Sequence, residues 1–131
     1  MTKITAIIPT FNEQQRIKNS LNSAQFADEV IVIDSFSTDD TISIVKKSNA
    51  ILLQRKFDNF SKQKNYAIQH ASFDWIVWID ADEVLTKDLQ QEIKSAIENP
   101  NENVGYYIYR IFFFKGKKMS FTGTQNDKLI R

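Results

Sequence analysis

Short apolar runs alternate with segments of helical periodicity from Ile4 to Pro100, and this alternation limits the fold more than any other feature. The runs have almost no polar positions, as expected for strands that are covered on both faces. Such alternation is typical of a parallel sheet whose strands are joined by right-handed helical crossovers. We therefore predict an α/β fold, with a Rossmann-like, mostly parallel sheet flanked by helices. Strands are expected at 4–8, 30–33, 51–53 and 75–79. Helices are expected at about 13–23, at about 61–71 and from Thr86 to 99, and a further helix should begin at a cap within 37–40 and run to about 48.

The character of the sequence changes after Pro100. Residues 106–114 are aromatic and rich in strand formers, and the Lys115-Gly116-Lys117 segment can turn the chain back toward 119–121. This pattern predicts a C-terminal β-hairpin. We expect its rings to pack in a core rather than to stack on sugars, because aromatic residues are favoured in strands.

Composition excludes several classes of protein. The 131 residues suit one domain with its own core, and 17 basic against 16 acidic residues give no electrostatic basis for binding nucleic acid. Without cysteine there is no disulfide framework and no thiolate zinc site. No apolar run reaches the roughly 18 residues of a transmembrane helix. We expect a cytoplasmic protein, with contact to the inner face of the cell membrane and the oligomeric state left open.

Two carboxylates follow the apolar run 75–79, at Asp80 and Asp82. In open α/β sheets, ligands bind outside the carboxyl ends of the strands, where these side chains should lie. Hard cations such as Mg²⁺ and Mn²⁺ take oxygen ligands and are often held by one or two carboxylates together with substrate phosphates. The pair therefore predicts a metal-assisted nucleotide diphosphate site. The alternative is that both carboxylates only cap the next helix.

Two other predicted strands deliver polar residues to the same edge. The first strand, which we expect to end at Pro9, is followed by Thr10, Phe11 and Glu13, and the second by Asp34. Asp34 alone is equally consistent with a turn that it begins with Ser35 and Ser37. The loop after the first strand contains no glycine, so it cannot be the backbone cradle of a dinucleotide fold. Phosphate must then be neutralised by a metal and by side chains.

Three ordered segments resemble the motifs of family 2 glycosyltransferases of the GT-A fold. They read IIPTFNE at 7–13, VIDSFSTDDT at 32–41 and WIDADE at 78–83. Within that family, residues 57–67, with Gln63, Lys64 and Asn65, are most similar to bacterial lipopolysaccharide core glucosyltransferases. The resemblance extends over essentially the whole chain and implies an inverting, metal-dependent transfer of a hexose from a UDP-glucose-like donor to a saccharide or lipid-linked acceptor.

The resemblance also implies roles for individual residues. The loop with Thr10, Phe11 and Glu13 would contact the base and ribose, and Asp34 would hydrogen-bond the nucleobase. Asp80 would contact the ribose or a metal-bound water, whereas Asp82 would coordinate the Mn²⁺ or Mg²⁺ ion. Lys64 is the lysine that we expect to face the nucleotide, although a solvated helix face is an equally common place for it.

An inverting transfer needs a general base for the acceptor hydroxyl. In the resembling enzymes this carboxylate lies after the segment at 122–131, where the family usually continues. Asp127 is the only carboxylate in that segment and hence the only candidate, and we expect a chain that is truncated on the acceptor side. Two alternatives stay open: a non-catalytic donor-binding or partner-binding module, and a sugar nucleotidyltransferase, for which a glycine-rich basic first loop is missing.

Overall fold

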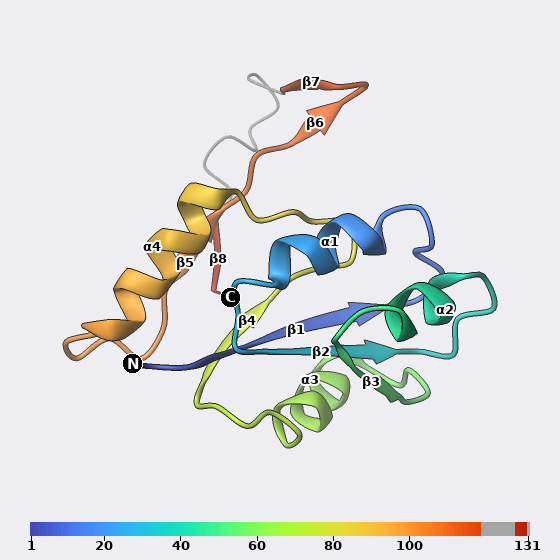
Figure 1. The fold of residues 1–131 in the computed structure, drawn as a ribbon, viewed down its shortest axis with the longest axis horizontal. Coiled ribbons are helices and arrows are strands. Elements are labelled where there is room, and N and C mark those ends of the chain that lie inside the picture. Colours follow the sequence, from blue (N-terminus) through green and yellow to red (C-terminus); the bar gives the residue numbers. More distant parts are fainter. Residues whose placement is uncertain (119–127, 131) are drawn as a thin grey trace. The chain divides into compact units, whose positions relative to one another are not determined.

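A computed structural model describes residues 1–118 and 128–130 of the chain. Its centre is a parallel sheet of four strands in the order β3-β2-β1-β4 (Figure 1). The strands are β1 (Ile4–Thr10), β2 (Glu29–Asp34), β3 (Ile51–Gln54) and β4 (Trp75–Trp78), and all their pairings are parallel. The predicted α/β fold is confirmed.

Helices cover both faces of this sheet. Helices α1 (Ile17–Ala24) and α2 (Thr41–Lys46) contact one another, and Figure 1 shows α3 (Phe60–Ile68) on the opposite side of the strands. The helix α4 (Lys87–Glu98) follows β4 and begins at Thr86, whose hydroxyl accepts a hydrogen bond from the amide of Leu89 as predicted for a cap. The first two crossovers each return the chain to the neighbouring strand, whereas the third crosses from β3 to β4 on the far side of β1. Because all four strands are parallel, their carboxyl ends lie at one edge.

The core has two layers because side chains of a strand alternate between the faces of the sheet. Ile7, Ile31 and Ile33 form a buried cluster with Ala67 of α3. The intervening residues Ile8 and Val32 are also fully buried, so the two central strands β1 and β2 are covered on both faces there. Each such side chain contributes about 1.5–3 kcal/mol to the free energy of unfolding.

The strand β1 does not stop at Pro9 as predicted but continues to Thr10. In the ladder the carbonyl of Ile7 accepts from Ile79 on the β4 side, and Pro9 has the same orientation as Ile7. Pairing with β4 ends at Trp78, so the missing amide of Pro9 costs no ladder hydrogen bond. The longer β1 places Thr10 beside Asp34 in the register.

Helix α1 begins at Ile17, whereas the sequence predicted a start near Glu13. Asn12 has a positive φ of 53°, and residues 13–16 form a turn instead of a first helical turn. Polar contacts to the neighbouring loop, described below, hold this segment and override its helical periodicity. The predicted inward side chains of the helix, Ile17, Leu21 and Ala24, are buried.

The chain divides into two compact units, Met1–Asn99 and Pro100–Arg131. The second begins where the sequence changes character. In it, β5 (Tyr107–Tyr109) pairs with β8 (Lys128–Ile130), and β6 (Phe113–Phe114) pairs with β7 (Lys117–Lys118), both in antiparallel fashion. The predicted hairpin is present as β6 and β7, with Gly116 at a φ of 76° in its turn. Its predicted return at 119–121 lies outside the described residues.

The predicted aromatic core of this second unit is wrong for three of the rings. Tyr107, Tyr109 and Phe113 are 59%, 62% and 66% exposed. Their strands are only two or three residues long and pair in two-stranded ladders, so a second layer does not cover these side chains.

In the described part of the chain, no helix combines the length and the apolar character that crossing a membrane requires.

Candidate functional site

Asp34 is the last residue of β2, and its carboxylate is fully buried at the carboxyl edge of the sheet. One carboxylate oxygen accepts the Ser37 amide at 2.9 Å and the Gln54 side-chain amide at 3.4 Å, and the other accepts the Ser37 hydroxyl. Hydrogen-bond donors, rather than a cation, therefore compensate its burial. The turn at 35–37 folds back on this side chain.

The loops after β1 and β2 are joined by hydrogen bonds of their side chains. The backbone amide of Asn12 donates to the Ser37 hydroxyl at 2.8 Å, and the side-chain oxygen of Asn12 accepts the backbone amide of Thr38 at 2.8 Å. Further along, the side-chain oxygen of Gln14 accepts the Asp40 amide at 3.0 Å. Because these bonds run in both directions, each loop fixes the backbone of the other.

A buried hydroxyl completes the connection between these loops. Thr41 is fully buried, accepts the Glu13 amide at 2.8 Å and donates to Asp39. Asp39 also accepts the amides of Thr41 and Gln14. Partial desolvation raises the pKa of the Asp39 carboxyl, but the hydrogen bonds from Thr41 and Gln14 outweigh it, and the pKa is lowered from its ordinary value.

The first loop reaches the loop after β4 through an arginine. Arg16 forms a bidentate pair with Glu13 at 2.8 and 3.1 Å, and its guanidinium lies 3.8 Å from the carboxylate of Asp82. The side chains of Arg16 and Asp82 are 59% and 52% exposed. A surface pair of this kind contributes at most about 1 kcal/mol, so Asp82 remains accessible to a stronger cation.

Asp80 is half-buried and is held by its backbone. Its amide donates to Glu83 at 3.1 Å, and its carbonyl accepts the Glu83 amide at 2.9 Å and the Ser20 hydroxyl at 3.3 Å. The predicted carboxylates lie along the carboxyl edge, but in the described residues no three acidic or histidine side chains are close enough to hold a metal ion together. A cation here would need ligands from a bound molecule.

Helix α3 brings two neighbouring side chains to this edge. The buried Gln63 donates its side-chain amide to the Ser35 hydroxyl at 2.9 Å, directly after Asp34. The ammonium of Lys64 lies 5.1 Å from the ring centre of Trp78, the last residue of β4. The ammonium of Lys64 thus lies near the side chain of the residue that ends β4. Lys62 instead lies 3.7 Å from Asp58.

The two remaining predicted residues of the first loop differ in exposure. Thr10 is 5% exposed, and its hydroxyl oxygen is a buried side-chain atom without a hydrogen-bond partner. Such atoms are uncommon and call for an explanation. Phe11, directly after β1, is 56% exposed. Thr10 therefore offers a hydroxyl without a partner, and Phe11 offers an exposed ring at the same strand end.

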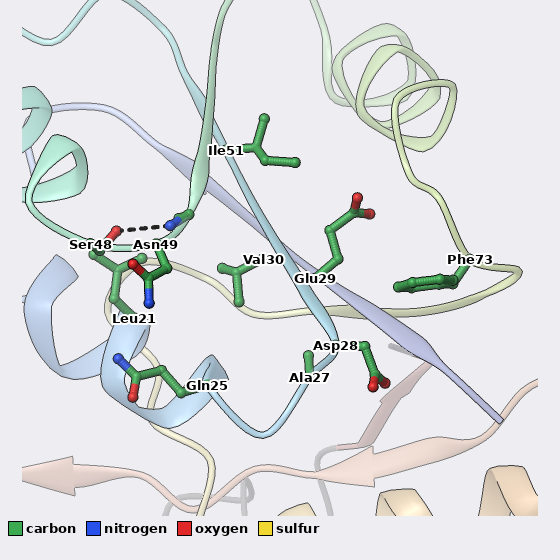
Figure 2. Close-up of a pocket in the computed structure, with 11 residues that line it drawn as sticks. Leu21, Gln25, Ala27, Asp28, Glu29, Val30, Ser48, Asn49, Ile51 and Phe73 are labelled. Atoms are coloured by element: carbon green, nitrogen blue, oxygen red, sulfur yellow. Dashed lines mark hydrogen bonds between the residues drawn. The ribbon is translucent and has the colours of Figure 1, made fainter. Parts of the chain in front are cut away.

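Two surface hollows lie at opposite edges of the sheet. A hollow of about 310 Å³ is lined by the first loop, residues 12–16, and by Asp39. A larger one of about 500 Å³ lies at the amino ends of β2 and β3, where Figure 2 shows Glu29, Val30 and Ile51 around it. Since ligands of open α/β sheets bind at the carboxyl ends, the smaller hollow belongs to the candidate site.

Sequence interpretation placed Thr10, Phe11, Glu13, Asp34, Asp80 and Asp82 at strand ends, and each lies there or in the adjoining loop. It named Ser37 as a turn residue after Asp34 but missed two other partners that hold these side chains, Thr41 and Gln54. The run of hydroxyl and amide side chains after β2 was a usable signal, since such residues bond to nearby backbone. Asp127, the candidate base, lies outside the described residues.

The chain matches known proteins in sequence over its whole length. A family model, described as glycosyl transferase family 2, matches residues 5–127. An uncharacterized glycosyltransferase of Rickettsia typhi is 36% identical over 134 residues, which is 100% of this chain and 46% of the relative. The poly(ribitol-phosphate) β-N-acetylglucosaminyltransferase TarS of Staphylococcus aureus is 28% identical over 79% of this chain and 20% of its own. The chain thus spans less than half the length of these relatives.

Solved structures share the fold. The crystal structure of S. aureus TarS 1–349 in complex with UDP has a TM-score of 0.65 at 25% identity and covers 91% of this chain and 38% of that one. Glucosyl-3-phosphoglycerate synthase from Mycobacterium tuberculosis, also in complex with UDP, has a TM-score of 0.68 at 23% identity, covering 83% and 45%. The second likeness concerns the fold alone, and both neighbours agree with a GT-A-like sheet.

Proposed function

Since the chain belongs to glycosyl transferase family 2, we propose that its carboxyl edge binds a nucleotide-diphospho sugar, UDP-glucose-like, whose hexose is transferred to a saccharide or lipid-linked acceptor. The observation that carries this proposal is Asp34, a buried carboxylate fixed by Ser37 at the point where α/β folds bind nucleotides. UDP bound to TarS, a relative of this chain, supports a uridine nucleotide.

The nucleoside would be held by the two loops that are tied together. In this proposal Asp34 accepts a hydrogen bond from the base edge, and the unpartnered hydroxyl of Thr10 lies beside it to serve the same ligand. Phe11 and Glu13 contact the base and ribose from the first loop. Lys64 approaches the diphosphate from α3, where its charge is offset at present by a ring rather than by a carboxylate.

The second half of the site concerns the diphosphate. Asp82 is an exposed carboxylate without a strong partner, which fits a Mn²⁺ or Mg²⁺ ion that takes its other ligands from phosphate and water. Asp80 would orient the ribose or a metal-bound water. A bound ion would neutralise the negative charge that develops on the leaving diphosphate.

The reaction is a single displacement that inverts the anomeric centre. The acceptor hydroxyl oxygen forms the new bond to the anomeric carbon while the bond to the diphosphate breaks, and the electron pair leaves with the diphosphate. A carboxylate base takes the hydroxyl proton, and Asp127 is the candidate for that role in this chain. The hydrogen-bonded loops and Asp82 hold the donor in place for this step.

The relatives indicate the class of the acceptor. TarS acts on poly(ribitol-phosphate) by its name, which supports a cell-envelope polymer as the acceptor class. A lipopolysaccharide core acceptor is the narrower form of this proposal, and it rests on the similarity of residues 57–67. If the acceptor is lipid-linked, transfer takes place at the cytoplasmic face of the cell membrane.

Calorimetry with UDP and MnCl₂ tests the donor site. The intact protein should bind UDP, and Mn²⁺ should strengthen the binding in the parent but not in Asp82→Ala. Absence of UDP binding, or equal strengthening by Mn²⁺ in both proteins, contradicts the proposal. Release of glucose from UDP-glucose, followed separately, would distinguish an active transferase from a donor-binding module.

A further inference from the structure

Phe36 has a backbone conformation that bulky residues rarely adopt. Its φ is 63°, in the left-handed region, where a Cβ approaches the following carbonyl oxygen too closely. In the described part of the chain, the other non-glycine residues with positive φ are Asn12, Asn101 and Lys115. Asparagine tolerates this region, whereas an aromatic residue is an outlier that requires a reason.

The course of the loop explains the left-handed backbone at position 36 but not why the residue there is a phenylalanine. The chain must reverse between Asp34 and Ser37, because the amide and hydroxyl of Ser37 both donate to the Asp34 carboxylate. A glycine or asparagine at position 36 would make the same reversal with less strain. The backbone therefore does not account for a phenylalanine here.

Packing does not account for the ring either. Phe36 is 53% exposed, so burial offers little compensation for its strained backbone. Phe11 on the neighbouring loop is 56% exposed. The two loops run side by side, since the Ser35 amide donates to the Thr10 carbonyl one residue beyond the paired strands. Two uncovered rings thus flank the buried Asp34 at one edge of the sheet.

We propose that the ring of Phe36 stacks on the nucleobase of the donor and is a determinant of nucleotide affinity; this inference rests on the proposed function. Asp34 reads the edge of the base by hydrogen bonding, and Phe36 offers an apolar face to its plane. Stacking on an aromatic side chain tolerates every base. Phe36 accordingly adds affinity for nucleotides in general, while Asp34 selects among them.

Replacement by glycine separates the ring from the backbone. Phe36→Gly should raise the melting temperature by about 2–6 °C, because strain is relieved, and should weaken UDP binding about fivefold or more. Pyrophosphate binding in the presence of Mn²⁺, which needs no base contact, should stay unchanged. Phe36→Trp keeps a stacking face and should retain parental UDP affinity.

Lys115→Gly is the matched control, since Lys115 has a φ of 47° and belongs to the other compact unit. It should also raise the melting temperature, with no change in UDP affinity. Equal UDP affinity in Phe36→Gly and the parent would overturn the stacking role, as would equal losses of UDP and pyrophosphate binding. If the parent itself fails to bind UDP, the proposed function fails first, which is a different result.

Discussion

The loops after β1 and β2 differ from the loop after β4 in how firmly their polar side chains are held. Asp34 is buried among three donors, and Thr41 joins Asp39 to Glu13. Asp82, by contrast, is half exposed and has an arginine at 3.8 Å. The nucleoside side of the proposed site is thus formed before any ligand binds, whereas the metal side needs the diphosphate for completion.

Removing the fixed carboxylate should have the largest effect. Asp34→Ala leaves the donors of Ser37 and Gln54 without their acceptor and takes away the proposed base contact. We expect UDP affinity to fall by about 30-fold or more and the free energy of unfolding by about 1–3 kcal/mol. Calorimetry and denaturant unfolding measure the two quantities.

Asp40→Ala is the control for this loop, because the Asp40 side chain is exposed and forms no cap hydrogen bond. It should leave both quantities close to those of the parent. A UDP affinity of Asp34→Ala equal to that of Asp40→Ala would show that the buried carboxylate is only structural.

Asp82→Ala should affect binding but not stability. We expect the Mn²⁺-dependent part of UDP affinity to fall by about tenfold or more, since even indirect partners of metal ligands contribute that much. The melting temperature should stay within about 1–2 °C of the parent, because an exposed surface pair is weak. Asp74→Ala, also exposed and located before β4 at the opposite edge, should change neither.

Thr41→Val tests the connection between the two fixed loops. The substitution preserves shape but leaves the Glu13 amide and the Asp39 carboxylate without their hydroxyl partner, and this should cost about 1–3 kcal/mol of unfolding free energy. Thr38→Val is the control, since that side chain is exposed and its hydroxyl has only a 3.5 Å contact to Asn12. Equal stability of the two variants would contradict a structural role for the buried hydroxyl.

Acid should weaken the hydrogen-bonded connection between the loops after β1 and β2, with a smaller loss of stability than Thr41→Val causes. The pKa of Asp39 is lowered in the folded protein, so its contribution to stability is present above its ordinary pKa of 3.8 and is lost as the pH falls through the lower folded value. The melting temperature of Asp39→Asn should therefore fall less steeply below about pH 4 than that of the parent. Parallel melting curves in both proteins would show that Asp39 does not contribute.

The sequence predicted the succession of strands and helices along the chain because buried strands and amphipathic helices have different periods. It located Asp34 and Asp82 at strand ends for the same reason. It could not show that Asp34 belongs to the strand and is buried, since this depends on Ser37 folding back from beyond the turn. Hydrogen bonds between a turn and a side chain leave no periodic trace, although the run of hydroxyl and amide residues after β2 was a local signal for them.

Two errors have the same physical origin. The first helix begins late because Asn12 bonds to Ser37 and Thr38, which lie more than 20 residues away in the chain. The strand β1 passes through Pro9 because its neighbour β4 ends before proline would have to donate. Local propensity indicated the opposite in both places, and tertiary pairing decided the outcome.

Titration of Mn²⁺ in the absence and presence of UDP tests most directly whether the two sides of the site differ. Protein alone should show weak or undetectable Mn²⁺ binding, because Asp82 has no neighbouring carboxylates that complete a metal site in the described residues. With saturating UDP, Mn²⁺ should bind at least about tenfold more tightly. Equally tight Mn²⁺ binding with and without UDP would contradict a metal side that the diphosphate completes.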